Sequence, residues 1–161
     1  MQSFLKLLLA MTCPKRILEV GAAVGFSSIL MAEYAPEACE IVTIENYEKR
    51  IPIARENFKR AGKDEQITLL EGDAAEILPT LTEPFDLIFM DPPYDQELEK
   101  QVLKYLAGSS LVYEDTVIIV EASLNTDFSY IGELGFSLIK EKRYKTNKHV
   151  FLEKAGKEEI C

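Results

Sequence analysis

Cysteine and histidine are scarce in this 161-residue sequence. It has three cysteines (Cys13, Cys39 and Cys161) and one histidine (His149), and their spacing matches no metal-binding motif. An odd number of cysteines without a zinc pattern argues against both a disulfide framework and a zinc site. We therefore expect no bound metal and reduced thiols, as is typical of a cytoplasmic protein.

Long apolar runs and an excess of basic charge are also missing. The apolar start of the chain, residues 1–11, is far shorter than the roughly 20 residues of a membrane span, and its one basic residue lies inside the apolar run. We expect a helix over residues 1–14 rather than a targeting segment. Lysine and arginine number 18 against 27 aspartates and glutamates, which gives a net charge of −9. This balance disfavours binding of nucleic acid through bulk charge, because phosphate contacts depend on basic side chains.

The sequence does contain an alternation of β-rich and helical segments. Its length, with 47% hydrophobic and 28% charged residues, predicts one globular domain over 1–161. Because some β-rich segments, such as 117–120, are apolar at successive positions, we expect a doubly wound parallel α/β sheet. The last two strands should form an antiparallel hairpin across the polar turn 145–148. The expected strands are 16–20, 40–45, 67–71, 85–91, 116–121, 136–144 and 149–153, and the later helices are 26–34, 47–61, 74–81, 95–107 and 127–133.

A glycine-bearing loop follows the first expected strand. It reads Glu19-Val-Gly21-Ala22-Ala-Val-Gly25-Phe-Ser27, and Ser27 opens the next helix. Glycine permits a tight turn and close approach of a ligand, and a helix N-terminus offers free N–H groups. The loop is neither G-x-G-x-x-G nor a P-loop, which disfavours NAD binding and ATP hydrolysis. Since ligand crevices in α/β sheets lie beyond the carboxyl ends of the strands, the loop is a candidate nucleotide-type site.

Two acidic side chains follow the next two expected strands. Glu45 stands about 20 residues after the glycine loop, where an acidic residue binds ribose hydroxyls in dinucleotide folds. Asp73, followed by Ala74, comes after the third strand. Either carboxylate could instead cap a helix. Ligand-type features at three successive strand ends nevertheless favour a nucleotide-type cofactor.

The fourth expected strand runs directly into Asp91-Pro92-Pro93-Tyr94. Two prolines end a central strand and make a rigid turn. The carboxylate of Asp91 and the carbonyl of Pro92 can accept hydrogen bonds from an –NH₂ group, while Tyr94 can stack on a planar base. Such acceptors would aim the lone pair of the amine, so that positioning and electrostatics carry the reaction. The alternative is a proline-capped loop with an exposed tyrosine.

Taken together, these motifs resemble the class I S-adenosylmethionine-dependent methyltransferases. The resemblance implies a Rossmann-like, seven-stranded sheet with an antiparallel terminal hairpin, and S-adenosyl-L-methionine as the cofactor. It places Gly21 and Gly25 along the methionine and ribose, Glu19 near the cofactor amine, Glu45 on the ribose hydroxyls and Asp73 at the adenine amino group. The implied cofactor-binding residues are Glu19, Gly21, Ala22, Gly25, Ser27, Glu45, Asp73 and Ala74.

The two parts of the chain resemble different branches of that class, as a chimera or a recombined gene would. Residues 1–90, with the cofactor-binding half at 15–90, resemble the bacterial O-methyltransferases of the catechol, caffeoyl-CoA and tRNA hydroxyuridine type. Their shared motifs include Thr43-Ile-Glu45. Residues 91–154 resemble the bacterial 16S rRNA guanine-N2 methyltransferases, chiefly through Asp91-Pro-Pro-Tyr94.

The resemblance and the residues together favour methylation of guanine N2 in ribosomal RNA, with Asp91-Pro92-Pro93-Tyr94 as the catalytic residues. The alternatives are an O-methyltransferase acting on a small molecule or tRNA, and a cofactor-binding scaffold with little turnover. Metal-dependent O-methyltransferases also need an Asp-Asn pair after the fifth strand, where this chain has Glu121-Ala-Ser123. Because that ligand set is incomplete, we expect no metal site.

A group of basic residues lies in the expected terminal hairpin. Lys142, Arg143, Lys145 and Lys148 cluster there, and Tyr144 stands among them. Basic residues gathered on one surface are typical of phosphate contacts, so this group is a candidate RNA-binding surface. The alternative is a solvated edge whose lysines block pairing with another strand.

Overall fold

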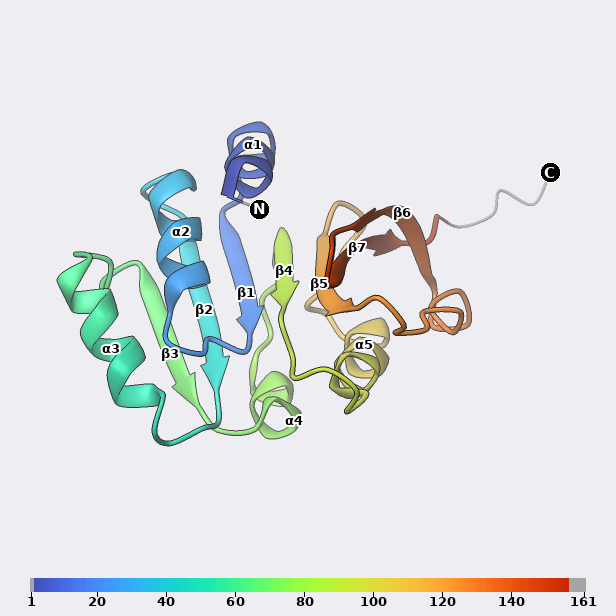
Figure 1. Cartoon of the computed structure of the whole chain (residues 1–161). Coiled ribbons are helices and arrows are strands. Elements are labelled where there is room, and N and C mark those ends of the chain that lie inside the picture. Colours follow the sequence, from blue (N-terminus) through green and yellow to red (C-terminus); the bar gives the residue numbers. More distant parts are fainter. Residues whose placement is uncertain (1, 157–161) are drawn as a thin grey trace. The chain divides into compact units, whose positions relative to one another are not determined.

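The computed structural model describes residues 2–156, so that Cys161 lies outside the described part of the chain. The chain divides into two compact units, Met1–Leu81 and Thr82–Cys161. Among the described residues, the first unit contains strands β1 to β3 and the second contains strands β4 to β7 (Figure 1). Among residues 2–156, none of the helices has the length and apolar character needed to cross a membrane.

The first unit contains a parallel three-stranded sheet in the order β3-β2-β1. Its strands lie where the sequence predicts them, and their central residues are buried, as at Ile17, Leu18 and Ile41. The elements are α1 (Gln2–Thr12), β1 (Arg16–Val20), α2 (Phe26–Tyr34), β2 (Glu40–Glu45), α3 (Ile51–Arg60), β3 (Ile67–Glu71), α4 (Ala74–Ile77) and the 3₁₀ turn η1 (Leu78–Thr80).

Three helices of this unit begin or end elsewhere than expected. The helix expected over 74–81 is the short helix α4, which ends at Ile77 and continues as the 3₁₀ turn η1. Helix α1 ends at Thr12 rather than at residue 14, because Cys13 takes a left-handed conformation (φ 43°). Helix α3 begins at Ile51 rather than at residue 47. The carboxylate of Glu45 accepts hydrogen bonds from the backbone of Asn46 and Tyr47, which holds this stretch as a loop.

The second unit contains β4 (Leu87–Met90), α5 (Leu98–Ala107), β5 (Val117–Ser123), β6 (Phe136–Arg143) and β7 (Asn147–Lys154). Strands β4 and β5 are parallel, whereas β7 pairs antiparallel with both β5 and β6. The predicted terminal hairpin is therefore confirmed, with β7 between β5 and β6. Its turn spans residues 144–146 rather than 145–148, because β7 already begins at Asn147. A register shift between Leu138 and Lys140 interrupts the outer strand of this hairpin.

The helix expected over residues 127–133 is wrong. The segment is a series of turns, in which Ile131 N–H bonds Phe128 O and Leu134 N–H bonds Ile131 O, each three residues back. At its start, the carboxylate of Asp127 accepts from both the backbone N–H and the hydroxyl of Ser129. Such side-chain bonding to the nearby backbone competes with helix formation.

The fold class is confirmed as a Rossmann-like seven-stranded α/β fold with antiparallel strands at its C-terminal end. Each unit has its own buried side chains, which cover the strands and position the loops described below. The largest of these in the first unit are Leu9, Ile17, Leu18, Met31, Ile41 and Leu78, and those in the second are Phe85, Ile88, Met90, Leu103, Leu106 and Leu111.

Candidate active site

The loop after β1 turns back over the end of β2. The backbone N–H groups of Gly21 and Ala22 both donate to Ile44 O, at 2.9 and 3.0 Å. Gly21 (φ 99°) and Gly25 (φ 91°) are left-handed, a conformation that disfavours other residues. The predicted need for glycine at these two positions therefore has a backbone reason in the structure.

Helix α3 packs against the same loop. A Cβ atom at Gly25 would lie 2.5 Å from Cε1 of Phe58, so that only glycine fits against this buried ring. The side-chain amide of Asn57 donates to Val24 O at 2.8 Å. Packing on α3, in addition to any ligand, thus fixes the form of the loop.

Glu19 is fully buried at the start of this loop. Its carboxylate accepts hydrogen bonds from the hydroxyls of Ser27, Ser28 and Thr43, the last at 2.6 Å. Burial raises the pKa of Glu19, and the three hydroxyl donors oppose that shift. Glu19 therefore ties the end of β1 to β2 and to the first turn of α2. Its expected contact with a cofactor amine stays a prediction.

Glu45 lies at the end of β2 and is 6% exposed. Its Oε2 accepts from the backbone N–H of Ala23 at 2.7 Å, and its Oε1 accepts from Asn46 at 3.1 Å and from Tyr47 at 2.9 Å. A carboxylate oxygen can accept two hydrogen bonds, so Oε2 retains a lone pair for a ribose hydroxyl. The carboxylate thus fits the role that the sequence predicts for it.

Asp73 follows β3 and caps helix α4. Its Oδ1 accepts from the backbone N–H of Ala75 at 2.8 Å, and Ala74 is the first residue of the helix. The helix-capping alternative is therefore realised, while the carboxylate keeps acceptor capacity for an adenine amino group. Gly72 N–H donates to Glu45 O at 2.9 Å, which brings the loops after β2 and β3 together.

The eight predicted cofactor-binding residues lie on β1, at the end of β2, or on the segments that follow β1 and β3. Figure 1 shows these strands and the segments that follow them. The roles of the eight residues toward S-adenosylmethionine stay predictions. Sequence reasoning did not assign a role to Ser28, Thr43 or Asn57. In the structure, Ser28 and Thr43 donate to Glu19, and Asn57 donates to Val24 O.

In the second unit, Asp91-Pro92-Pro93-Tyr94 begins directly after the buried strand β4. The strand ends at Met90, one residue earlier than expected, so that Asp91 stands outside the sheet and is exposed. Tyr94 is 41% exposed. The motif therefore presents a carboxylate and an aromatic ring to solvent on a proline-stiffened turn.

The hydroxyl of Tyr94 is held by Glu121 at the far end of β5. Tyr94 Oη donates to Glu121 Oε1 at 3.1 Å, and Asn147 Nδ2 donates to the same oxygen at 2.6 Å. Nε2 of the buried His149 lies 3.4 Å from Glu121 Oε2. The histidine holds the pKa of Glu121 below its usual value, and burial raises the pKa of Tyr94. Sequence reasoning missed Asn147, whose place depends on the strand register.

The end of β5 does not suit a divalent cation. Its residues Glu121-Ala-Ser123 provide one carboxylate and no amide, in place of the carboxylate and amide implied for the metal-dependent O-methyltransferases.

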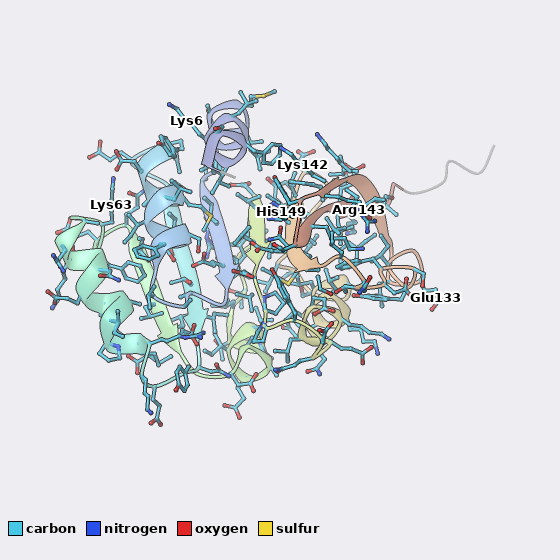
Figure 2. All side chains as sticks on the ribbon, in the orientation of Figure 1. Lys6, Lys63, Glu133, Lys142, Arg143 and His149 are labelled. Atoms are coloured by element: carbon cyan, nitrogen blue, oxygen red, sulfur yellow. The ribbon has the colours of Figure 1, made fainter. Side chains whose placement is uncertain are left out.

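The structure separates the four candidate RNA contacts into two kinds. Lys145 is exposed in the turn of the hairpin, and Lys142 and Arg143 lie on β6 (Figure 2). Arg143 is bound to Glu141 Oε1 at 2.9 Å. Lys148 is only 6% exposed, and its Nζ lies 5.5 Å from the centre of the Phe128 ring. Lys142 and Arg143 are successive residues of β6, so their side chains point to opposite faces of the sheet and do not form one basic surface.

Several known methyltransferases are similar to this chain. The O-methyltransferase family matches residues 1–127. A catechol O-methyltransferase from Niastella koreensis is 37% identical over 122 residues, which are 71% of this chain and 55% of that protein. A tRNA1(Val) (adenine(37)-N6)-methyltransferase from Haemophilus influenzae is 28% identical over 134 residues, 78% of this chain and 57% of that protein. The chain thus spans about half the length of the curated relatives it matches.

Among solved structures, an O-methyltransferase from Bacillus cereus in complex with SAH aligns with a TM-score of 0.74 at 25% identity, over 95% of this chain and 80% of that one. The predicted resemblance to class I methyltransferases and the cofactor S-adenosyl-L-methionine are confirmed at the level of the family. The likeness of residues 91–154 to guanine-N2 methyltransferases stays a prediction. Because the family match covers residues 1–127, the chain belongs to the O-methyltransferase family of S-adenosylmethionine-dependent methyltransferases.

Proposed function

We propose that this protein transfers a methyl group from S-adenosylmethionine to the exocyclic amine of a nucleobase in RNA, with guanine N2 of ribosomal RNA as the favoured substrate. The observation that carries the proposal is the exposed Asp91-Pro92-Pro93-Tyr94 turn directly after β4. Two acceptors next to a stacking surface suit an amine on a planar ring better than they suit an isolated hydroxyl.

The chemistry asks for positioning rather than for a covalent intermediate. S-adenosylmethionine, when bound, supplies a methyl group on a sulfonium sulfur and leaves as S-adenosylhomocysteine. Asp91 and the carbonyl of Pro92 would accept hydrogen bonds from the two N–H groups of the amine and so orient its lone pair. The carboxylate of Asp91 would take the proton that the nitrogen loses on methylation.

Two further observations support an RNA substrate. The relative from Haemophilus influenzae is named for methylation of an adenine amine in tRNA. The chain carries a net charge of −9, so contacts to phosphate must be local. The candidates for these contacts are Lys142 on β6 and Lys145 in the turn, called here the basic strip of the hairpin. With so few cations, we expect weak, strongly salt-dependent affinity for RNA.

O-methylation of a small molecule is the second candidate. It is favoured by the family match over residues 1–127 and by the catechol O-methyltransferase from Niastella koreensis. The sequence Glu121-Ala-Ser123 weighs against a metal-dependent form of this activity, because it lacks the carboxylate and amide pair that such a site needs. A metal-independent transfer to a hydroxyl group is the form that remains in competition.

The deciding experiment offers labelled S-adenosylmethionine to total RNA and to catechol in parallel, followed by mass spectrometry of the products. We expect the label in N2-methylguanosine. Asp91→Ala should lower transfer about 100- to 1,000-fold, a typical cost of removing one group that stabilises a transition state. Binding of S-adenosylhomocysteine, measured by calorimetry, should be unchanged. Asp115→Ala is the matched control, because Asp115 is exposed in the same unit but lies outside the motif.

Each other outcome has a defined meaning. Label in N6-methyladenosine keeps the amine class and overturns guanine as the target. Label in catechol alone, with Asp91→Ala inactive or not, overturns the amine class in favour of O-methylation. Binding of S-adenosylhomocysteine without transfer to either substrate indicates a cofactor-binding scaffold with little turnover.

A further inference from the structure

Side chains from two antiparallel strands converge on one carboxylate beside the Asp91–Tyr94 turn. Glu121 on β5 faces His149 on β7, and Ser123 faces Asn147 two residues further along. Successive side chains of a strand alternate between the faces of a sheet, so Glu121, His149 and Asn147 share one face. The register of the β5–β7 pair, rather than any local motif, therefore assembles this cluster.

The carboxylate of Glu121, at the centre of the cluster, is bound by two residues of β7. Asn147 Nδ2 lies 2.6 Å from Glu121 Oε1, and His149 Nε2 lies 3.4 Å from Glu121 Oε2. His149 is 3% exposed, and the centre of its ring lies 4.9 Å from that of Tyr144. Because its partners are packed into the hairpin, Glu121 has little freedom to turn away.

Tyr94 is the one partner of Glu121 that comes from the loop. The two prolines before it fix the direction of the main chain, but they do not restrict the side-chain torsions of the tyrosine. The bond from Tyr94 Oη to Glu121 Oε1, at 3.1 Å, fixes the far end of the side chain. The ring is still 41% exposed, so its surface is presented to solvent while its hydroxyl is anchored.

We propose that Glu121 is a positioning residue, which orients the ring of Tyr94 so that its exposed face meets a planar substrate. This inference rests on the proposed function, in which Tyr94 stacks on the target base. Glu121 itself touches the tyrosine hydroxyl and not the reacting atoms. Its contribution is to fix in advance a ring that would otherwise lose its freedom on binding.

The kinetic test uses a double-mutant cycle on RNA methylation. Glu121→Ala and Tyr94→Phe should each raise KM about three- to tenfold, the cost of ordering one side chain on binding, with little change in kcat. The double variant should be no worse than either single variant, because both remove the same contact. Glu121→Gln keeps an acceptor oxygen and should stay close to wild type. Glu153→Ala is the matched control, because Glu153 is exposed on the same hairpin.

A second measurement does not depend on activity. In protein labelled with ¹³C at tyrosine Cζ, the Tyr94 signal is assigned by its loss in Tyr94→Phe. Glu121→Ala should lower the pKa of Tyr94. In the wild-type protein, the Glu121 carboxylate accepts a hydrogen bond from the phenol and so favours its neutral form. If Glu121→Ala fails to bind S-adenosylhomocysteine, Glu121→Gln replaces it. This variant removes the negative charge but keeps an acceptor oxygen, so a smaller change of the same sign is expected.

The two arms separate failure of the inference from failure of the proposed function. A wild-type protein that methylates no amine, with a Tyr94 titration that responds to Glu121→Ala, overturns the function and keeps the orienting contact. A Tyr94 titration unaffected by both Glu121→Ala and Glu121→Gln overturns the positioning role. Additive KM effects in the cycle, or a loss confined to kcat, overturn it as well.

Discussion

The carboxylate of Glu45 accepts a hydrogen bond from the backbone N–H of Ala23, 2.7 Å away and 22 residues earlier in the chain. Ala23 has a left-handed conformation (φ 50°) in the middle of the glycine loop. The residue expected to bind the ribose thus also stabilises the strained turn on which the cofactor would lie. Shape and recognition at this site depend on the same side chain.

Replacing Glu45 should therefore lower the affinity for the cofactor by more than the loss of one ligand contact would. We expect Glu45→Ala to reduce S-adenosylhomocysteine affinity by about 100-fold, since it removes a charged acceptor from both the ligand and the loop. Glu45→Gln, which keeps one acceptor, should lose less. Titration calorimetry measures the effect, with the exposed Glu48→Gln as control. Equal affinities in wild type and Glu45→Ala would contradict the assigned role.

Alanine at Gly25 should be far more disruptive than alanine at Gly62. Both glycines are left-handed (φ 91° and 68°), so both substitutions carry backbone strain of about 1–2 kcal/mol. Only at Gly25 would the new Cβ collide with Phe58, at 2.5 Å, whereas it meets nothing within 4 Å at Gly62. Urea unfolding should show a further loss of about 1–3 kcal/mol for Gly25→Ala, as expected for overpacking.

The substitution Phe58→Leu provides a check on this explanation. Combined with Gly25→Ala, Phe58→Leu should restore part of the lost stability, because it removes the ring that the new methyl group would meet. The same change alone should destabilise the protein. A double variant that shows only the sum of the two losses would refute the steric account.

Glu19 should contribute chiefly to stability. Glu19→Ala removes the acceptor of three hydroxyls at Ser27, Ser28 and Thr43, and the unpaired buried groups should cost about 2–4 kcal/mol. Glu19→Gln retains one acceptor and should cost less. Chemical denaturation gives both values, with the exposed Glu37→Ala as control. A loss below 1 kcal/mol in Glu19→Ala would show that the hydroxyls find other partners.

The Glu121 cluster should make stability depend on pH in the acid range. His149 lowers the pKa of Glu121 from its ordinary value of 4.5, so the folded state favours the ionised carboxylate. This contribution is fully present above about pH 4.5 and is lost as the pH falls through the lower, folded-state value. The difference in unfolding free energy between wild type and Glu121→Gln should therefore shrink on acidification. A difference that stays constant down to pH 3 would contradict the shift.

The basic strip of the hairpin should control affinity for RNA. Changing Lys142 and Lys145 together to glutamate should weaken RNA binding and lower its salt dependence by about two counterions, because each lysine releases roughly one. Lys148→Met should leave the salt dependence unchanged, since Lys148 is buried against Phe128. Fluorescence anisotropy at several salt concentrations tests both statements. An unchanged slope in the Lys142/Lys145 variant would remove the strip from the RNA-binding surface.

The parts of the fold that the sequence predicts well are those set by local pattern. Strands β1, β2 and β3 have the predicted bounds, because short apolar runs are closed off by polar or glycine residues. Residues 127–133 were predicted poorly, because their apolar spacing suits a helix while Asp127 bonds the backbone at Ser129 instead. A side chain that competes for a backbone N–H leaves no trace in hydrophobic periodicity.

The residues of the candidate site also fall into a group that the sequence reveals and a group that it does not. Glycines and acids at strand ends are visible because their chemistry is needed at a fixed distance along the chain. The groups that hold them are not. Thr43 reaches Glu19 across neighbouring strands, and Asn147 reaches Glu121 only through the register of β5 and β7. Such partners depend on tertiary pairing, which the spacing of residues in one sequence does not specify.

The order of the strands in the second unit has a consequence for synthesis on the ribosome. Strand β7 pairs with both β5 and β6 and follows both of them in the chain. Until Asn147–Lys154 has emerged, one edge of β5 is unpaired and β6 lacks its partner, and that edge of β5 is lined by apolar residues. A nascent chain paused before this point exposes a surface on which chaperones or other nascent chains can bind. Synonymous codons just upstream of Asn147 that change the rate of translation can therefore raise or lower the yield of folded protein.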